Sequence, residues 1–170
     1  MTGQLHQAKH PINPVIAGKY GHPYHPILVT VPIGAWVASL VFDIASRVVD
    51  DGAFLADGST WLIGIGVVGA VAAAVFGFLD LLAIPRGTRA FGTALAHMGL
   101  NLAVTVAYLV NFFWRQGGDG QAASTATGPL VLSVVSLAVL GASGYLGGTL
   151  AYRYGVRVAD ETTQAEGFRR

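Results

Sequence analysis

Four side chains inside or at the edge of long apolar segments have functional groups that can bind a metal or move a proton: His25, Asp80, His97 and Asn101. Ionisable groups in such segments are costly, so each calls for a partner or a function. Neutral imidazole binds iron, copper and zinc, and an acidic neighbour can orient the ring. We therefore predict that His25 and His97 are metal or haem ligands. Asp80 and Asn101, which follows His97 by one helical turn, are predicted to orient them.

Glycines in the last apolar segment are predicted to reach the same membrane level as these side chains. Gly144 and Gly148 have small-xxx-small spacing, which lets a second helix, a substrate or a flat cofactor approach the backbone. Both are candidate cofactor-binding residues. A simpler interpretation stays open, in which Asp80 and His97 neutralise each other across adjacent helices and the glycines serve helix packing alone.

Other polar residues have simpler interpretations. Asp43 and Arg47 are four residues apart on one predicted helix, so we expect them to form an ion pair. His6 and His10 have the same spacing but lie in a polar tail, which favours solvation over a zinc site. The sequence contains no phosphate-binding loop, zinc-protease helix or serine nucleophile motif, so we predict no catalytic residue and no enzyme activity for the chain on its own.

The composition favours a membrane protein. Hydrophobic residues make up 53% of the 170 residues and charged residues only 11%, about half the charged share of an ordinary soluble domain. The net charge of +1 gives no reason to expect nucleic acid as a partner. With no cysteine, the chain has neither a disulfide framework nor a thiolate metal site.

Four apolar segments are each long enough to cross about 30 Å of hydrocarbon as a helix. They cover residues 27–48, 61–84, 91–114 and 129–152. The short polar links between them force neighbouring helices to run antiparallel. We therefore predict an all-α polytopic membrane protein with a four-helix up-down transmembrane bundle. Pro32 is expected to kink the first span.

The distribution of Lys and Arg predicts the orientation. One side carries the cations Lys9, Lys19, Arg86, Arg89, Arg153 and Arg157. We assign this side to the cytoplasm, so both termini lie inside. The predicted parts are a cytoplasmic arm over residues 1–24, a transmembrane domain over 25–158 and a cytoplasmic tail over 159–170. The first twenty residues lack an apolar core and do not resemble a signal peptide.

Several short motifs resemble the bacterial DUF2231 family of predicted membrane proteins. The motifs are His25-Pro26-Ile27-Leu28-Val29, Pro32-Ile33-Gly34, Phe42-Asp43, Gly77-Phe78-Leu79-Asp80, Ile84-Pro85-Arg86-Gly87-Thr88-Arg89, His97 with Asn101, Ser143-Gly144-Tyr145-Leu146-Gly147-Gly148 and Tyr152-Arg153-Tyr154-Gly155-Val156. The resemblance implies four helices in a bacterial inner membrane. Similar domains occur joined to Rieske-type iron–sulfur domains, which implies a place in membrane electron transfer. This chain has no cysteine for a Rieske centre.

Many members of that family carry a second histidine at the position of Thr30, so the resemblance leaves His25 and His97 as the ligand pair here. The leading functional hypothesis is a redox-associated membrane protein that binds b-type haem between these two residues. An alternative is a non-catalytic subunit or assembly factor of a larger membrane complex. A third is a proton- or ion-coupled transporter that uses Asp80 and His97 as a proton relay. The expected partners are the lipid bilayer and either a larger membrane redox complex or further copies of the chain in a homo-oligomer.

Overall fold

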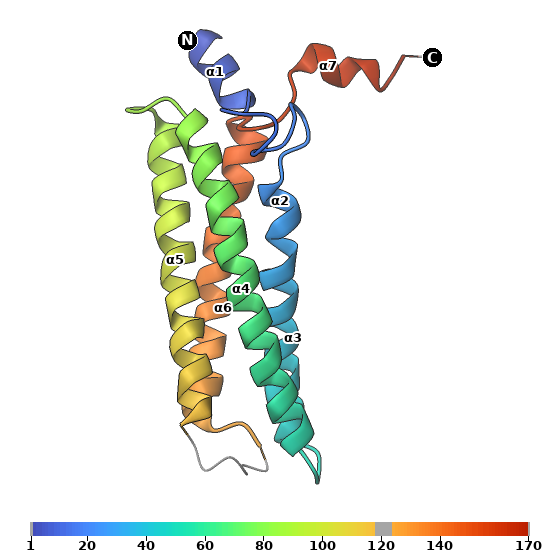
Figure 1. Ribbon diagram of the computed structural model, residues 1–170, viewed down its shortest axis with the longest axis vertical. Helices are drawn as coiled ribbons and strands as arrows, with labels where there is room; N and C mark the ends of the chain where they lie inside the picture. Colours follow the sequence, from blue (N-terminus) through green and yellow to red (C-terminus); the bar gives the residue numbers. More distant parts are fainter. Residues whose placement is uncertain (1, 118–123, 170) are drawn as a thin grey trace. The chain divides into compact units, whose positions relative to one another are not determined.

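Long apolar helices make up most of the chain. The computed structural model describes residues 2–117 and 124–169, and that part contains four helices long and apolar enough to cross a membrane. The elements in chain order are α1 (Thr2–Lys9), α2 (His25–Leu28), α3 (Thr30–Ser46), α4 (Ala53–Ala83), α5 (Arg89–Gln116), α6 (Thr127–Gly148), the π-helical turn η1 (Thr149–Arg153) and α7 (Glu161–Glu166) (Figure 1). Within these bounds there is no strand. The predicted all-α, four-span fold is confirmed.

The predicted segments agree with the observed helices except at their ends. α2 and α3 together form the first span, from His25 to Ser46. The second span begins at Ala53 rather than residue 61, so the helix includes residues that had been assigned to the polar link. η1 extends the last span to Arg153.

The first span is interrupted at Val29, between α2 and α3. Pro32, three residues later, has no N–H to donate to the carbonyl of Leu28, and its ring crowds that carbonyl. The helix resumes with the bond from the Ile33 amide to the Val29 carbonyl, at 3.2 Å. Val29 itself keeps a helical backbone, with φ −64° and ψ −17°, so the kink expected at Pro32 stays a prediction.

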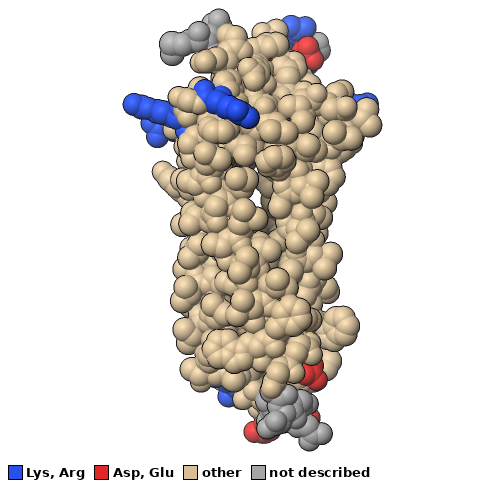
Figure 2. All heavy atoms as spheres, turned by 60° about the vertical axis from the view of Figure 1, so that its left-hand side comes forward, with Lys and Arg blue, Asp and Glu red and all other residues tan. Residues whose placement is uncertain are grey.

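The surface of these helices is apolar. Large hydrophobic side chains stay exposed on all four spans, among them Val41, Val68, Val106 and Val131. Figure 2 shows uncharged side chains covering the helices, with the charged side chains grouped rather than scattered over them. Such a surface requires a hydrocarbon environment rather than water.

The chain forms two compact units. Unit 1 comprises Met1–Ile27, Ala73–Gly99 and Ser143–Arg170, and unit 2 comprises Leu28–Ala72 and Leu100–Ala142. Each unit contains parts of four spans.

The core of unit 2 is an aromatic stack. Trp36 and Tyr108 lie with ring centroids 4.2 Å apart and ring planes 9° from parallel, packed against Ile63 and Val104. The Tyr108 hydroxyl donates to the Ser133 carbonyl at 3.3 Å. This stack joins α3, α4, α5 and α6.

Unit 2 also contains a buried ion pair between Asp43 and Arg115. The Arg115 nitrogens Nη1 and Nη2 donate to the two carboxylate oxygens of Asp43 at 2.8 and 2.7 Å. The Asp43 side chain is fully buried. The predicted Asp43–Arg47 pair is wrong, because Arg47 donates to the Thr125 carbonyl and the Thr127 hydroxyl, both at 2.9 Å. Arg115 faces both carboxylate oxygens at once, a bidentate geometry that is among the strongest hydrogen-bonded pairings.

Hydrogen bonds extend this ion pair across the unit. The Thr125 hydroxyl donates to the Asp43 carboxylate at 2.9 Å, and Arg115 Nε donates to the Asn111 side-chain oxygen at 2.9 Å. Asn111 in turn donates to the Ser133 hydroxyl at 2.9 Å. The network thus links α3, α5, α6 and the segment preceding α6.

In unit 1 the N-terminal segment packs on the ends of the spans. Ala8 joins a buried cluster with Leu81, Ile84, Ala94, Leu150 and Val156. The amide of Arg157 donates to the Ala8 carbonyl at 2.9 Å, and Lys9 Nζ donates to the Val158 carbonyl at 3.3 Å. The segment before the first span is therefore an ordered part of unit 1.

The Asp43–Arg115 pair yields a stability prediction. Arg115→Met leaves the buried Asp43 carboxylate without its counterion and should lower the free energy of unfolding by about 3–5 kcal/mol. Arg47→Met is the matched control and should cost about 1 kcal/mol, because it removes hydrogen bonds at a partly exposed site. The measurement is unfolding of the purified protein in detergent. Equal losses in the two variants would contradict the assigned partner.

Candidate functional site

His25, the first residue of α2, is held by the backbone of α4. Its Nδ1 lies 2.9 Å from the Ala73 carbonyl oxygen. Because a carbonyl only accepts, this nitrogen carries the proton in the neutral ring, which places the lone pair on Nε2. The ring lies against Gly77, where an added Cβ would stand 2.9 Å from His25 Cε1. Glycine at that position makes room for the imidazole.

His97 on α5 is held in the same way by α6. Its Nδ1 lies 2.8 Å from the Ser143 carbonyl oxygen and 3.0 Å from the Ser143 hydroxyl. The Ser143 hydroxyl donates to the His97 carbonyl at 3.1 Å, so its oxygen is placed to accept from Nδ1. Gly147 faces the ring, because an added Cβ there would stand 3.0 Å from His97 Cε1.

The two histidine rings are neighbours. Their centroids lie 6.4 Å apart and their planes are 87° from parallel. Both rings have Nδ1 on a backbone carbonyl, so both have the tautomer with the lone pair on Nε2. The structure therefore brings together the two residues that were predicted as ligands.

Asp80 pairs with an arginine. Its Oδ1 lies 2.7 Å from Nε of Arg157, and the Arg157 side chain is 3% exposed. Arg157 Nη2 donates to the carbonyls of Ala17 and Gly18 at 2.8 and 3.0 Å. The interpretation in which Asp80 and His97 neutralise each other is replaced by this ion pair. Arg157 was one of the cations that assigned this side to the cytoplasm; its backbone has φ +61°, and its side chain is buried.

The remaining predicted site residues lie elsewhere. Asn101 is on α5 one turn after His97 and belongs to unit 2. Gly144 is exposed, and a Cβ added there would meet no described atom within 4 Å. At Gly148 the nearest such atom is Cδ2 of Tyr152, at 3.9 Å. The glycine of this stretch that contacts His97 is Gly147.

Three residues that support the histidines were not among the predicted site residues: Ser143, Gly77 and Gly147. Each belongs to a motif that carries the family resemblance, and Gly77 lies one turn after Ala73 on α4. The motifs could be recognised in the sequence. Residue types do not show, however, which backbone carbonyl an imidazole ring will contact.

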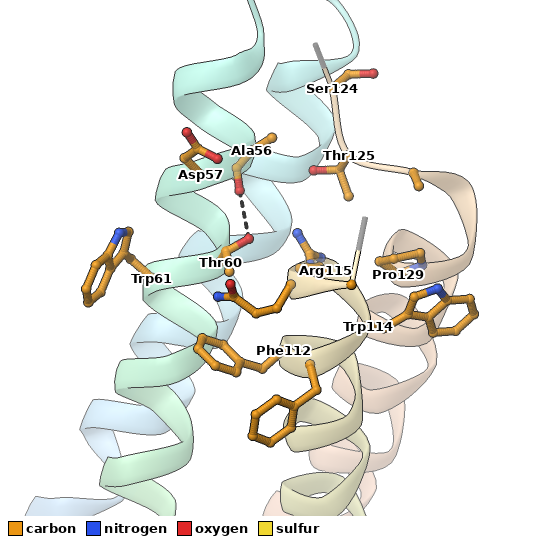
Figure 3. A pocket seen from close by; sticks show the side chains of 14 residues that line it. Ala56, Asp57, Thr60, Trp61, Phe112, Trp114, Arg115, Ser124, Thr125 and Pro129 are labelled. Atoms are coloured by element: carbon orange, nitrogen blue, oxygen red, sulfur yellow. Dashed lines mark hydrogen bonds between the residues drawn. The ribbon is translucent and has the colours of Figure 1, made fainter. Parts of the chain in front are cut away.

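Unit 2 contains a separate cavity of about 800 Å³ (Figure 3). Its lining includes Trp61, Phe112, Trp114, Arg115 and Thr125. Arg115 is engaged by Asp43, and Thr60 donates its hydroxyl proton to the Ala56 carbonyl at 3.1 Å. Gly117 and Ser124, which also line it, border residues that the structure does not describe.

The histidine pair provides two protein ligands for a metal ion. Among residues 2–117 and 124–169 there is no group of three or more His, Cys, Asp or Glu side chains that could hold a metal ion. A metal at His25 and His97 would need further ligands from outside the chain's acidic and imidazole groups.

Four helices long and apolar enough to cross a membrane define a multi-pass α-helical membrane protein. Residues 21–160 match the family described as predicted membrane protein, DUF2231. The chain belongs to this family. Comparison with curated proteins and with solved structures gave no match.

The contacts of Arg157 predict that its loss lowers the global stability and also speeds local proteolysis. Arg157→Met leaves the Asp80 carboxylate without this counterion and the Ala17 and Gly18 carbonyls without their donor. Unfolding free energy should fall by about 3 kcal/mol or more, and trypsin should cut faster after the exposed Lys19.

Two further variants test the assignment. Arg157→Lys keeps the charge beside Asp80 but loses the planar fork, so it should restore part of the stability and leave Lys19 more cleavable. Arg153→Met, at an exposed position, should change neither property. Unchanged cleavage at Lys19 in both Arg157 variants would show that Arg157 does not hold this segment.

Proposed function

We propose that this protein binds b-type haem through His25 and His97 and takes part in electron transfer in a bacterial inner membrane. The observation that carries the proposal is the paired geometry of the two imidazoles. Both Nδ1 atoms are fixed on backbone carbonyls, at 2.9 and 2.8 Å, and the rings are 6.4 Å apart. The same geometry can hold another transition metal, and the experiment below separates the two.

The spacing of the rings supports one metal between them. An imidazole nitrogen lies about 2 Å from a bound metal ion and about 1 Å from its own ring centre, so two imidazoles that held one metal ion between them would have ring centres about 6 Å apart. The observed 6.4 Å agrees with this value. A plain edge-to-face contact also falls in this range, and the anchoring of both rings is what favours ligation.

That anchoring is typical of metal-binding histidines. Such residues usually donate the other ring N–H to a carbonyl or carboxylate, which fixes the tautomer and the direction of the ligating nitrogen. The orienting role that was predicted for Asp80 and Asn101 is assigned instead to the carbonyls of Ala73 and Ser143. Haem, when bound, supplies one-electron chemistry. The chain's part is to hold both rings and keep them neutral.

Optical spectroscopy of the purified protein tests the proposal. Protein produced with added haem should show a Soret band and the α-band of six-coordinate low-spin iron. His25→Ala and His97→Ala should each lose that spectrum, whereas His22→Ala, at an exposed position, should keep it. No Soret band after supplementation, together with no bound metal by elemental analysis, would reject the site. A stoichiometric metal without haem would reject the haem assignment alone.

A pair of glycine variants gives a second test. Gly147→Ala places a Cβ 3.0 Å from His97 Cε1 and should displace the ring, weakening ligation and shifting the α-band. Gly144→Ala, three residues away, meets no described atom within 4 Å and should leave the spectrum unchanged. The spectra are compared at equal protein concentration. Equal effects of the two variants would show that the glycine contact does not position the ligand.

A second candidate function is that of a non-catalytic subunit of a larger membrane complex. The observation that favours it is the open face of α6, where Gly141 and Gly144 meet no described atom and Tyr145 is 76% exposed. Small residues let a helix from another chain approach closely. Size analysis in mild detergent that shows only free monomer would count against it.

A further inference from the structure

The segment before the first span has an unusual distribution of large and small apolar side chains. Its exposed residues include Val15 at 79%, Ile16 at 49% and Ile12 at 46%. Its buried residues include Ala8 and Ala17, at 5% and 2%. The large aliphatic side chains thus point away from the rest of unit 1, and the small ones point into it.

A segment surrounded by water would be expected to show the opposite distribution. In a soluble segment, burying Ile and Val rather than Ala removes more apolar area from water. An ordered segment that keeps its large aliphatic side chains outward therefore needs an apolar environment on that side. Lipid provides one.

Specific contacts hold the backbone of this segment in place, so its large aliphatic side chains stay exposed. Arg157 holds the carbonyls of Ala17 and Gly18, and the Asn13 side-chain oxygen accepts from the Val15 amide at 2.9 Å. Gly18 has φ +84°, and a Cβ there would collide with the His22 carbonyl oxygen. The turn that presents Val15 and Ile16 is thus held by specific contacts.

Its position in the chain places the segment at the membrane surface. Lys19 is six residues before His25, where the first span begins, and six residues reach at most about 20 Å. Unit 1 also contains the ends of the other spans. Its exposed cations include Lys19, Arg86, Arg89 and Arg153, which complement anionic lipid headgroups.

We propose that the segment Pro11–Lys19 is a membrane-surface anchor. Ile12, Val15 and Ile16 enter the boundary between headgroups and acyl chains, and the Lys19 ammonium contacts lipid phosphates. The segment is continuous with the span that follows, and the occupant of its apolar face is the anionic leaflet rather than a protein. This proposal stands whether or not haem binds.

Site-specific labelling tests the anchor, since the chain has no cysteine of its own. Val15→Cys and, as the matched control, Glu166→Cys at an exposed position of α7 are labelled with an environment-sensitive fluorophore. Each is reconstituted alone into phosphatidylcholine vesicles with and without phosphatidylglycerol. The label at position 15 should emit at shorter wavelength and be quenched by nitroxides on shallow lipid positions, while the label at 166 is quenched by iodide in the water.

The lipid contact should also depend on charge. Lys19→Gln in the Val15→Cys background should reduce the difference between the two kinds of vesicle. The proposal is overturned if iodide quenches position 15 as strongly as position 166. It is also overturned if neither iodide nor lipid nitroxides reach position 15, because protein then covers the segment.

Discussion

A polar side chain buried between membrane-spanning helices has no water to bond, so its partners must come from the protein. The Asp43–Arg115 pair shows what this constraint demands. Both carboxylate oxygens accept from Arg115, and Oδ1 also accepts from the Thr125 hydroxyl. These contacts join residues of different helices or of the link between them. Satisfying one buried charge therefore also fixes how the helical segments of unit 2 pack.

Unit 1 meets the same constraint with backbone carbonyls. Helical carbonyls have a second lone pair, and those of Ala73 and Ser143 accept from the two imidazoles. The carbonyls of Ala17 and Gly18 lie outside any helix and accept from Arg157. The arginine thus neutralises Asp80 and orders the N-terminal segment with one guanidinium group. Loss of the guanidinium group would therefore affect both the Asp80 ion pair and the order of the N-terminal segment.

Length and composition were enough to predict the four spans, because bilayer thickness sets the length of each helix. The partners of charged residues were harder to predict. Spacing of i,i+4 favoured Arg47 for Asp43, but residues 72 positions apart made the bidentate pair instead. Arg157 counted only as a cation of the cytoplasmic side, and nothing in its sequence position predicted its left-handed backbone or its buried side chain. The glycines raised a similar difficulty, because helix phase decides that Gly147, and not Gly144, faces His97.

The number of ligands bears on which group the histidine pair can hold. A structural zinc ion takes four protein ligands, and a catalytic one takes three. The described residues offer two imidazoles here, without a third acidic or imidazole group. Haem supplies four ligand nitrogens of its own, so His25 and His97 would be enough protein ligands to hold it. The perpendicular rings also let each imidazole keep its own carbonyl anchor, one on α4 and one on α6. Two neutral imidazoles would add no charge of their own to the membrane interior. On the number of ligands alone, haem is therefore a better proposal for this pair than a bare zinc ion.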